Sequence, residues 1–148
     1  MMACNTDQLK LDMKNVVVIG GGFTAVDCTR MAYRLGAKNI TLAYRRTKDD
    51  MYVSAHELEA TDAEGINLAF LISPVKIEHM DGKASGIYFI RNAISKNRSI
   101  KPIPNSEFFM KADTVIFAIG QEAEEKIVET GDRKPGDNFF MAGDFRNG

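Results

Sequence analysis

The sequence has little of what marks several classes of protein. Its 148 residues include two cysteines, Cys4 and Cys28, too few for a disulfide framework, so we expect a reducing, cytoplasmic location. No apolar run reaches the roughly 18 residues of a membrane-spanning helix, and polar residues 1–14 lack the apolar core of a signal peptide. The 19 basic and 20 acidic residues leave a net charge of −1, unlike the basic excess of nucleic-acid-binding proteins. We therefore expect no membrane and no nucleic acid among the partners.

Alternating short apolar runs and helical patterns fill the first half of the chain. The β-branched run 16–19 predicts a strand buried on both faces. Residues 23–35 predict a helix that ends before Gly36, and residues 39–44 predict a second strand. The buried face of this helix is expected to hold Val26, Met31, Ala32 and Leu35.

A second helix is expected from Ser54 to about Glu64. Ser54 and Glu57 have the spacing of a capping box, in which each side chain satisfies a free amide of the first turn. Gly65 ends the helix, and residues 67–72 predict a third strand. The order strand–helix–strand–helix–strand favours a parallel sheet with right-handed crossovers.

The pattern changes after residue 73, where several strands follow one another without a helix. Strands are predicted over 75–80, 86–92 and 100–110, with a hairpin turn at Asp81–Gly82. Two prolines, Pro102 and Pro104, make the last of these an edge strand or a partly irregular one. A buried strand over 114–119 then follows. The chain is therefore expected to be α/β, with a central parallel sheet, flanking helices and an antiparallel β-meander.

A glycine-rich turn separates the first strand from the first helix. Residues 20–25 read G-G-G-F-T-A and fit the pattern G-x-G-x-x-A, whose position between strand and helix makes a dinucleotide site the favoured interpretation. Gly20 would make the tight turn, Gly22 would let a pyrophosphate approach, and Ala25 would allow close helix–strand packing. The alternative is an ordinary strand–helix turn that happens to be rich in glycine.

Two arginines follow the second strand, where such folds select between NAD and NADP. An acidic residue there binds the ribose 2′-hydroxyl of NAD, whereas arginine accommodates the 2′-phosphate of NADP. Arg45 and Arg46 stand at this place, and the first acid, Asp49, comes later. The pair therefore predicts NADPH as the cofactor. The alternative is a solvated basic loop.

Together these segments resemble the NADPH-binding domain of the glutamate synthase small (beta) subunit family. The resemblance covers about residues 14–148 and extends to dihydropyrimidine dehydrogenase and related FAD/NAD(P)-binding oxidoreductases. It is carried by V-V-V-I-G-G-G-F-T-A-V-D-C (16–28), A-Y-R-R (43–46), F-L-I-S-P-V (70–75), A-D-T-V-I-F-A-I-G (112–120) and M-A-G-D (141–144).

The resemblance implies a Rossmann-like fold and a set of cofactor-binding residues. The residues expected to line the pyrophosphate are Gly20, Gly21, Gly22, Phe23, Thr24 and Ala25. Arg45 and Arg46 would hold the 2′-phosphate, and residues 118–120 (Ala118, Ile119 and Gly120) would pass near the nicotinamide half. Asp144 would contact FAD. No catalytic side chain and no metal ligand is expected, because nicotinamide and flavin carry the hydride chemistry.

The resemblance also implies a piece of a larger flavoprotein. Residues 1–13 are expected to form a disordered extension, 14–120 the NADPH domain, and 121–148 a tail that resembles the return strand into an FAD domain. Residues 139–142 would belong to the sheet of that FAD domain. The partners would be an FAD domain in the same parent chain and an electron-accepting subunit reached through iron–sulfur clusters. By itself the 148-residue chain is expected to bind nucleotide without turnover.

Three departures from the family pattern stand out. Phe23 replaces the usual Asn or Asp, Tyr52 stands where a proline is common, and residues 121–138 form a shorter segment than usual. An alternative function is a non-catalytic NADP-binding module that senses the cofactor or mediates assembly. A third is an NADH-linked member of the same group, which Arg45 and Arg46 disfavour.

Overall fold

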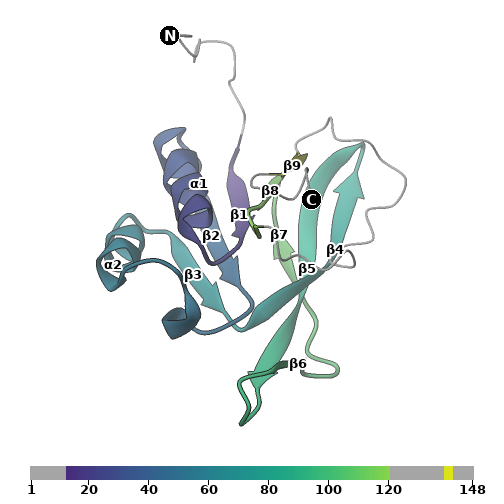
Figure 1. Ribbon diagram of the computed structural model, residues 1–148. Coiled ribbons are helices and arrows are strands. Elements are labelled where there is room, and N and C mark those ends of the chain that lie inside the picture. The colour runs from purple at the N-terminus through teal and green to yellow at the C-terminus, as the bar shows by residue number, and fades with distance from the viewer. Residues whose placement is uncertain (1–12, 121–138, 142–148) are drawn as a thin grey trace.

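The computed structural model describes residues 13–120 and the backbone of 139–141. Its elements are β1 (Asn15–Ile19), α1 (Phe23–Arg34), β2 (Asn39–Tyr44), the 3₁₀ turn η2 (Lys48–Asp50), α2 (Ala55–Ala63), β3 (Asn67–Phe70), β4 (Ile72–Met80), β5 (Lys83–Ile94), β6 (Ile100–Pro102), β7 (Phe108–Lys111), β8 (Thr114–Phe117) and β9 (Phe139–Met141). Figure 1 shows two sheets, one covered by helices and the other free of them. The predicted α/β class is confirmed.

A parallel sheet forms the centre of the molecule. Its strand order is β3-β2-β1-β8-β9, and all four pairings are parallel. The chain moves outward from β1 to β3 and later returns on the other side of β1 as β8. The neighbours β1 and β8 therefore form a switch point, where loops diverge at the carboxyl ends of the strands.

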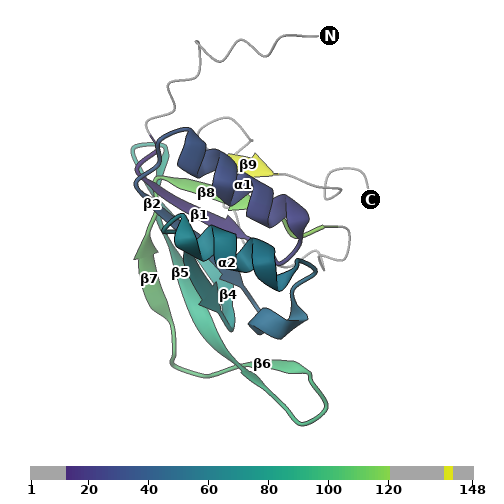
Figure 2. The same ribbon diagram turned by 90° about the vertical axis from the view of Figure 1, so that its left-hand side faces the viewer.

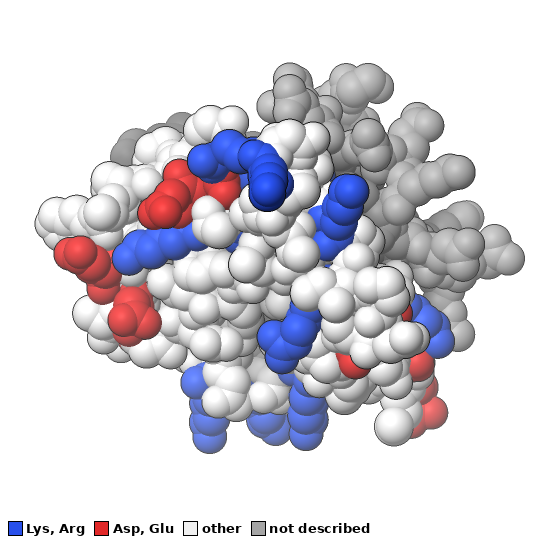
Figure 3. Space-filling view, turned by 90° about the horizontal axis from the view of Figure 1, so that it is seen from below, with Lys and Arg blue, Asp and Glu red and all other residues white. Residues whose placement is uncertain are grey.

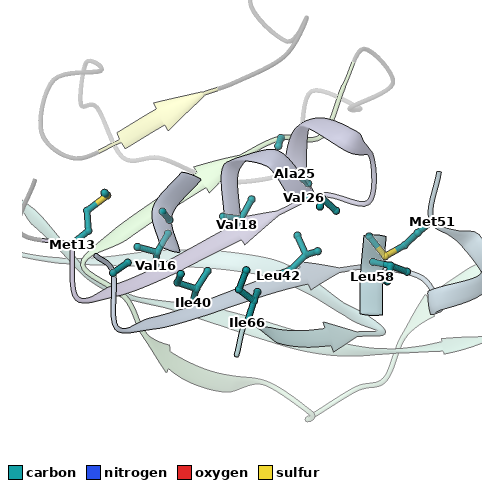
Figure 4. Close-up of a cluster of buried hydrophobic side chains, with 13 residues drawn as sticks. Met13, Val16, Val18, Ala25, Val26, Ile40, Leu42, Met51, Leu58 and Ile66 are labelled. Carbon is teal, nitrogen blue, oxygen red and sulfur yellow. The ribbon is translucent and has the colours of Figure 1, made fainter. Parts of the chain in front are cut away.

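The parallel sheet is covered on one face by α1 and α2 and on the other by the antiparallel strands (Figures 1 and 2). Alternate residues of β1 enter two separate cores: Val16 and Val18 face the helices, whereas Val17 and Ile19 face the meander. The core on the helix side includes Leu42, Leu58 and other buried side chains drawn in Figure 4. A strand apolar on both faces is what this three-layer arrangement requires.

Helix α1 buries a different face from the one predicted. Val26 and Ala32 are buried as expected, but Met31 and Leu35 are 53% and 50% exposed. The buried positions are Ala25, Val26, Thr29 and Ala32, which follow the 3.6-residue period. Small side chains let the helix lie close to the sheet, and the Thr29 hydroxyl donates to the carbonyl of Val26 at 2.6 Å, so its burial leaves no unpaired polar group.

The start of α2 and the ends of both helices are set by local sequence signals. Ser54 and Glu57 form the predicted capping box of α2, in which the Glu57 amide donates to Ser54 Oγ at 3.2 Å. Gly36 and Gly65 follow the two helices with φ of +90° and +79°, a backbone conformation that favours glycine. These predictions are confirmed.

The meander is built around β5, and two predicted strands are interrupted. β4 and β5 form a hairpin through Asp81–Gly82, and β6 and β7 pair with the other edge of β5. The strand predicted over 100–110 is partly irregular, one of the two outcomes expected from its prolines: it is interrupted between β6 and β7, because prolines cannot donate to the ladder and Asn105 has a φ of +58°. The strand predicted over 67–72 breaks at Leu71, whose φ of +57° turns the chain from one sheet into the other.

The ends of the chain fall largely outside the described residues. Residues 1–12 of the expected N-terminal extension lie outside the described residues. Met13, the last residue of that extension, is buried in the core on the helix side. Strand β9, expected to belong to an FAD-domain sheet, pairs here with β8 at the edge of the parallel sheet. Asp144 lies outside the described residues.

Candidate functional site

Three loops meet where the parallel strands end. The glycine turn follows β1, the two arginines follow β2, and residues 118–120 follow β8. Because β2, β1 and β8 are adjacent and parallel, these loops emerge at the same edge of the sheet. Figure 3 views the molecule from below, the direction in which the β5–β6 hairpin projects in Figure 1, and exposed basic side chains are spread across this face.

Gly20 lies where strand, helix and β8 come closest together. A Cβ atom on Gly20 would lie 2.3 Å from the carbonyl oxygen of Ala118 and 2.9 Å from the Cβ of Ala25. The backbone is held there by hydrogen bonds from the Gly20 amide to the Ala43 carbonyl at 3.0 Å and from the Ala118 amide to the Ile19 carbonyl at 2.8 Å. Only glycine fits at this junction without displacing backbone.

Gly21 is covered by the last residue of β2 and by the loop that follows it. A Cβ on Gly21 would meet the ring of Tyr44 at 2.1 Å. The Tyr44 hydroxyl donates to the Asp50 carbonyl at 3.0 Å, and the Tyr52 amide donates to the Gly21 carbonyl at 3.1 Å. Partial burial is the main reason why the pKa of Tyr44 is raised. The glycine turn and the β2 loop therefore form one packed unit.

Gly22 is the open position of the turn. Among the described residues, no atom beyond the adjoining backbone lies within 4 Å of the place where its Cβ would be. Gly22 is the N-cap of α1, no side chain caps this helix end, and the first turn has no acidic residue. Phe23, 57% exposed, and Thr24 are both at the surface beside it. The site thus offers free helix amides and the positive end of a helix dipole, which suit an anion.

The backbone of the arginine pair is tied to the meander. The carbonyl of Arg45 accepts a hydrogen bond from Asn92 Nδ2 at 3.1 Å, and the carbonyl of Arg46 accepts one from the Leu71 amide at 3.1 Å. Asn92 is buried and also donates to Ser73 Oγ at 2.8 Å. The Arg45 side chain is exposed and that of Arg46 is half-buried, so both guanidinium groups stand at the surface on a fixed backbone.

Sequence reasoning missed three residues that complete this loop: Asp50, Asn92 and Arg98. One carboxylate oxygen of Asp50, Oδ2, accepts from the Thr47 amide at 3.2 Å and from the Thr47 hydroxyl at 2.6 Å. Its other oxygen, Oδ1, pairs with Arg98 Nη2. The hydrogen bonds from Thr47, followed by the one from Arg98, lower the pKa of Asp50 to about 2.

Arg98 comes from the loop between β5 and β6, 48 residues from Asp50 and 52 from Arg46. Its carbonyl accepts a hydrogen bond from Arg46 Nη1 at 3.2 Å. No motif or local spacing in the sequence links residues so far apart. The T-x-x-D spacing of Thr47 and Asp50 was a signal that a capping box could occur there.

The carboxyl end of β8 completes the site. Ala118 is buried against Gly20, Ile119 is half-buried, and Gly120 is exposed with a φ of +63°. Eleven of the twelve sequence-predicted cofactor residues thus lie at one sheet edge, and the twelfth, Asp144, lies outside the described residues. Contacts join the three loops directly, through Gly20 and Ala118 and through Gly21 and Tyr44.

Other chemistry is sparse in the described part of the chain. Its His, Cys, Asp and Glu side chains include no group of three that could hold a metal ion. None of its helices has the length and apolar character needed to cross a membrane. Cys28 is half-buried, and its pKa is raised by burial and then by the charge of Asp27, which disfavours the reactive thiolate.

Comparison with known proteins agrees with this geometry. A family model described as pyridine nucleotide-disulphide oxidoreductase matches residues 1–138. The NADPH-Fe(3+) oxidoreductase subunit beta of Geobacter sulfurreducens is 39% identical over 117 residues, which cover 75% of this chain and 17% of that protein. The glutamate synthase [NADPH] small chain of Escherichia coli is 37% identical over 118 residues, covering 76% of this chain and 25% of that protein. The chain thus spans about a fifth of the length of these relatives.

Solved structures share the fold at low sequence identity. The thioredoxin reductase of T. acidophilum has a TM-score of 0.57 and 18% identity, and the match covers 88% of this chain and 44% of that chain. The thioredoxin reductase of Giardia duodenalis has a TM-score of 0.56 and 19% identity, with coverage of 88% and 44%. These matches show that the chain shares its fold with these proteins.

Proposed function

The chain belongs to the family of pyridine nucleotide-disulphide oxidoreductases, and on this premise we propose that it is the NADPH-binding domain of a larger flavoprotein oxidoreductase similar to the small subunit of glutamate synthase. The observation that carries the proposal is the pairing of an open, uncapped helix start at Gly22 with two arginines at the end of the neighbouring strand. A pyrophosphate and a 2′-phosphate are the two anionic groups of NADPH, and the site offers a place for each.

The described residues fit the cofactor in three respects. Apart from the adjoining backbone, no atom of residues 13–120 lies within 4 Å of the point that a Cβ on Gly22 would occupy, so the backbone can approach a pyrophosphate. No acidic side chain stands in the first turn of α1 to repel it. The site also lies at the switch point between β1 and β8, where ligands of such sheets bind.

Each part of the site then has a distinct task. The amides at the start of α1 hold the pyrophosphate, with Gly20, Gly21 and Ala25 shaping the turn and Phe23 and Thr24 at its rim. Arg45 and Arg46 pair with the 2′-phosphate, for which the guanidinium fork is well suited. Residues 118–120 line the path toward the nicotinamide. The chain thereby orients the cofactor, and bound NADPH supplies a hydride to a flavin.

We assign the rest of the reaction to parts of the parent protein beyond this site. Similar proteins are named as subunits of NADPH-dependent glutamate synthase, formate dehydrogenase and Fe(3+) oxidoreductase. The proposed partners are an FAD domain of the same chain, contacted through Asp144, and an electron-accepting subunit with iron–sulfur clusters. The proposed division is residues 14–120 for the NADPH domain and 121–148 for the return toward the FAD domain. A cytoplasmic location stays a prediction.

The test is a calorimetric titration of the 148-residue chain with NADPH and NADH at matched salt. We expect NADPH to bind clearly and NADH much more weakly. R45A and R46A should each weaken NADPH binding by about 10- to 100-fold, since a hydrogen bond to a charged group contributes roughly 1.5–3 kcal/mol. NADH binding should change little. Arg34→Ala, which removes an arginine from the last turn of α1 at the other end of that helix, is the control. Equal losses for both cofactors would refute the assignment of the arginine pair.

A further inference from the structure

We propose that Arg98, from the loop between β5 and β6, is a third guanidinium of the cofactor site and determines its specificity for the 2′-phosphate. This inference rests on the proposed NADPH-binding function and assigns a residue outside the parallel sheet to it. The meander then contributes directly to cofactor recognition instead of only covering the sheet.

The position of Arg98 carries the first part of the argument. Its carbonyl accepts from Arg46 Nη1 at 3.2 Å, so its backbone adjoins a side chain of the arginine pair. Arg98 has a φ of +61°, a left-handed conformation that is uncommon outside glycine and worth explaining where it occurs. This conformation allows the same residue to present its carbonyl to Arg46 and its guanidinium to Asp50.

The loop that carries Arg98 is held firmly in place. The Arg98 amide donates to the Ser95 carbonyl and the Ser95 amide to the Ser99 carbonyl, both at 2.9 Å. Asn97 Oδ1 accepts from the Ser99 amide at 3.2 Å. Further along β5, Asn92 binds the carbonyl of Arg45. The hairpin is therefore fastened both within itself and to the end of β2.

The Arg98 side chain is available to a second anion. Asp50 engages one nitrogen, Nη2, of a guanidinium that has five N–H donors, and the Arg98 side chain is 71% exposed. Asp50 is fixed through its other oxygen by Thr47. The carboxylate thus orients the guanidinium without enclosing it, on a residue whose backbone carbonyl binds Arg46, and a 2′-phosphate dianion would find a positioned donor set.

The experiment compares NADPH and NADH binding by calorimetry for wild type, R98A, D50N and K96A. R98A keeps the backbone carbonyl that Arg46 binds, so it removes only the guanidinium. We expect R98A to weaken NADPH about tenfold, the effect of losing one charge-assisted contact, with NADH unchanged. Lys96→Ala removes an equal charge from the same loop, where Lys96 is exposed, and should change NADPH binding less than threefold.

D50N distinguishes two roles for Arg98: direct contact with the 2′-phosphate, or holding the β5–β6 hairpin in place through its ion pair with Asp50. If Arg98 acted only by pinning the hairpin through Asp50, D50N and R98A would weaken NADPH equally, and the proposal would be overturned. Direct contact predicts that D50N weakens NADPH binding less than R98A does, because it removes the orienting carboxylate but leaves the Arg98 guanidinium in place. Should D50N not fold, R46A and R46A/R98A decide: a further loss from R98A in the R46A background supports direct contact, and no further loss overturns it.

Different binding results would refute the proposed function and the proposed role of Arg98. Wild type that binds NADPH and NADH equally would refute the NADPH assignment and Arg98 with it. Wild type that prefers NADPH, with R98A binding NADPH as tightly as wild type, would refute the role of Arg98 alone.

Discussion

Replacing Gly20 and Gly22 separately with alanine should divide stability from cofactor binding. The two glycines lie two residues apart in the same turn, yet their surroundings are opposite. A Cβ on Gly20 would overlap the Ala118 carbonyl at 2.3 Å, whereas a Cβ on Gly22 would have no atom of the described residues within 4 Å beyond the adjoining backbone. The same added methyl group is therefore expected to destabilise the fold in one case and to obstruct a ligand in the other.

For G20A the cost follows from overpacking against backbone. The overlapping atoms are the backbone carbonyl of Ala118, directly after β8, and the Cβ of Ala25, neither of which can rotate away. Overpacking of this kind costs about 1–3 kcal/mol, which at this chain length lowers Tm by roughly 2–12 °C. Thermal unfolding followed by circular dichroism measures the shift.

For G22A two small effects on stability oppose each other. Alanine is a poorer N-cap than glycine, but it also reduces the conformational freedom of the unfolded chain by about 0.4–1 kcal/mol. The free energy of unfolding should stay within about 1 kcal/mol of wild type. NADPH and NADH should both bind about tenfold more weakly, because the pyrophosphate common to both would meet the methyl group.

The two variants are controls for each other. A G20A chain as stable as wild type would refute the packing argument at the junction of β1, α1 and β8. A G22A chain that binds both nucleotides normally would refute the approach of a pyrophosphate at Gly22. Loss of NADPH binding alone would also contradict it, since the 2′-phosphate is assigned to the arginine pair.

Further predictions concern the loops and caps around the site. The pKa of Asp50 is lowered to about 2, so its contribution to stability is present above the unfolded value near 4 and is lost as pH falls toward 2; urea unfolding between pH 5 and 2 should show a shallower decline for D50N, and parallel declines would contradict this. N92A removes a buried amide that holds the Arg45 carbonyl, and should lower the urea-derived free energy of unfolding by about 1–3 kcal/mol; an unchanged value would refute the role of this bond. S54A deletes the cap of α2 and should cost about 1 kcal/mol, whereas S54T should restore most of it; equal stability of S54A and wild type would show that the cap contributes nothing.

Structural features formed by residues close together in the sequence were the most predictable. The strand at 16–19, the glycine turn, the capping box of Ser54 and Glu57 and the Asp81–Gly82 hairpin all depend on signals within a few residues, and the structure has each of them. The buried face of α1 was less predictable, because Met31 is apolar but the close approach to the sheet selects the smaller Ala25 and Thr29. Hydrophobicity alone does not show which face of a helix is packed most tightly.

The amino-acid sequence by itself determined the order of elements, the glycine turn and the placement of two arginines after a buried strand. The tertiary structure decided which distant residues join them. It sets β8 against β1, so that Ala118 closes on Gly20, and it brings Arg98 and Asn92 to the end of β2. The physical reason is that backbone propensities and caps act over a few residues, whereas these contacts join segments about 50 to 100 residues apart and form only once both sheets have taken their register.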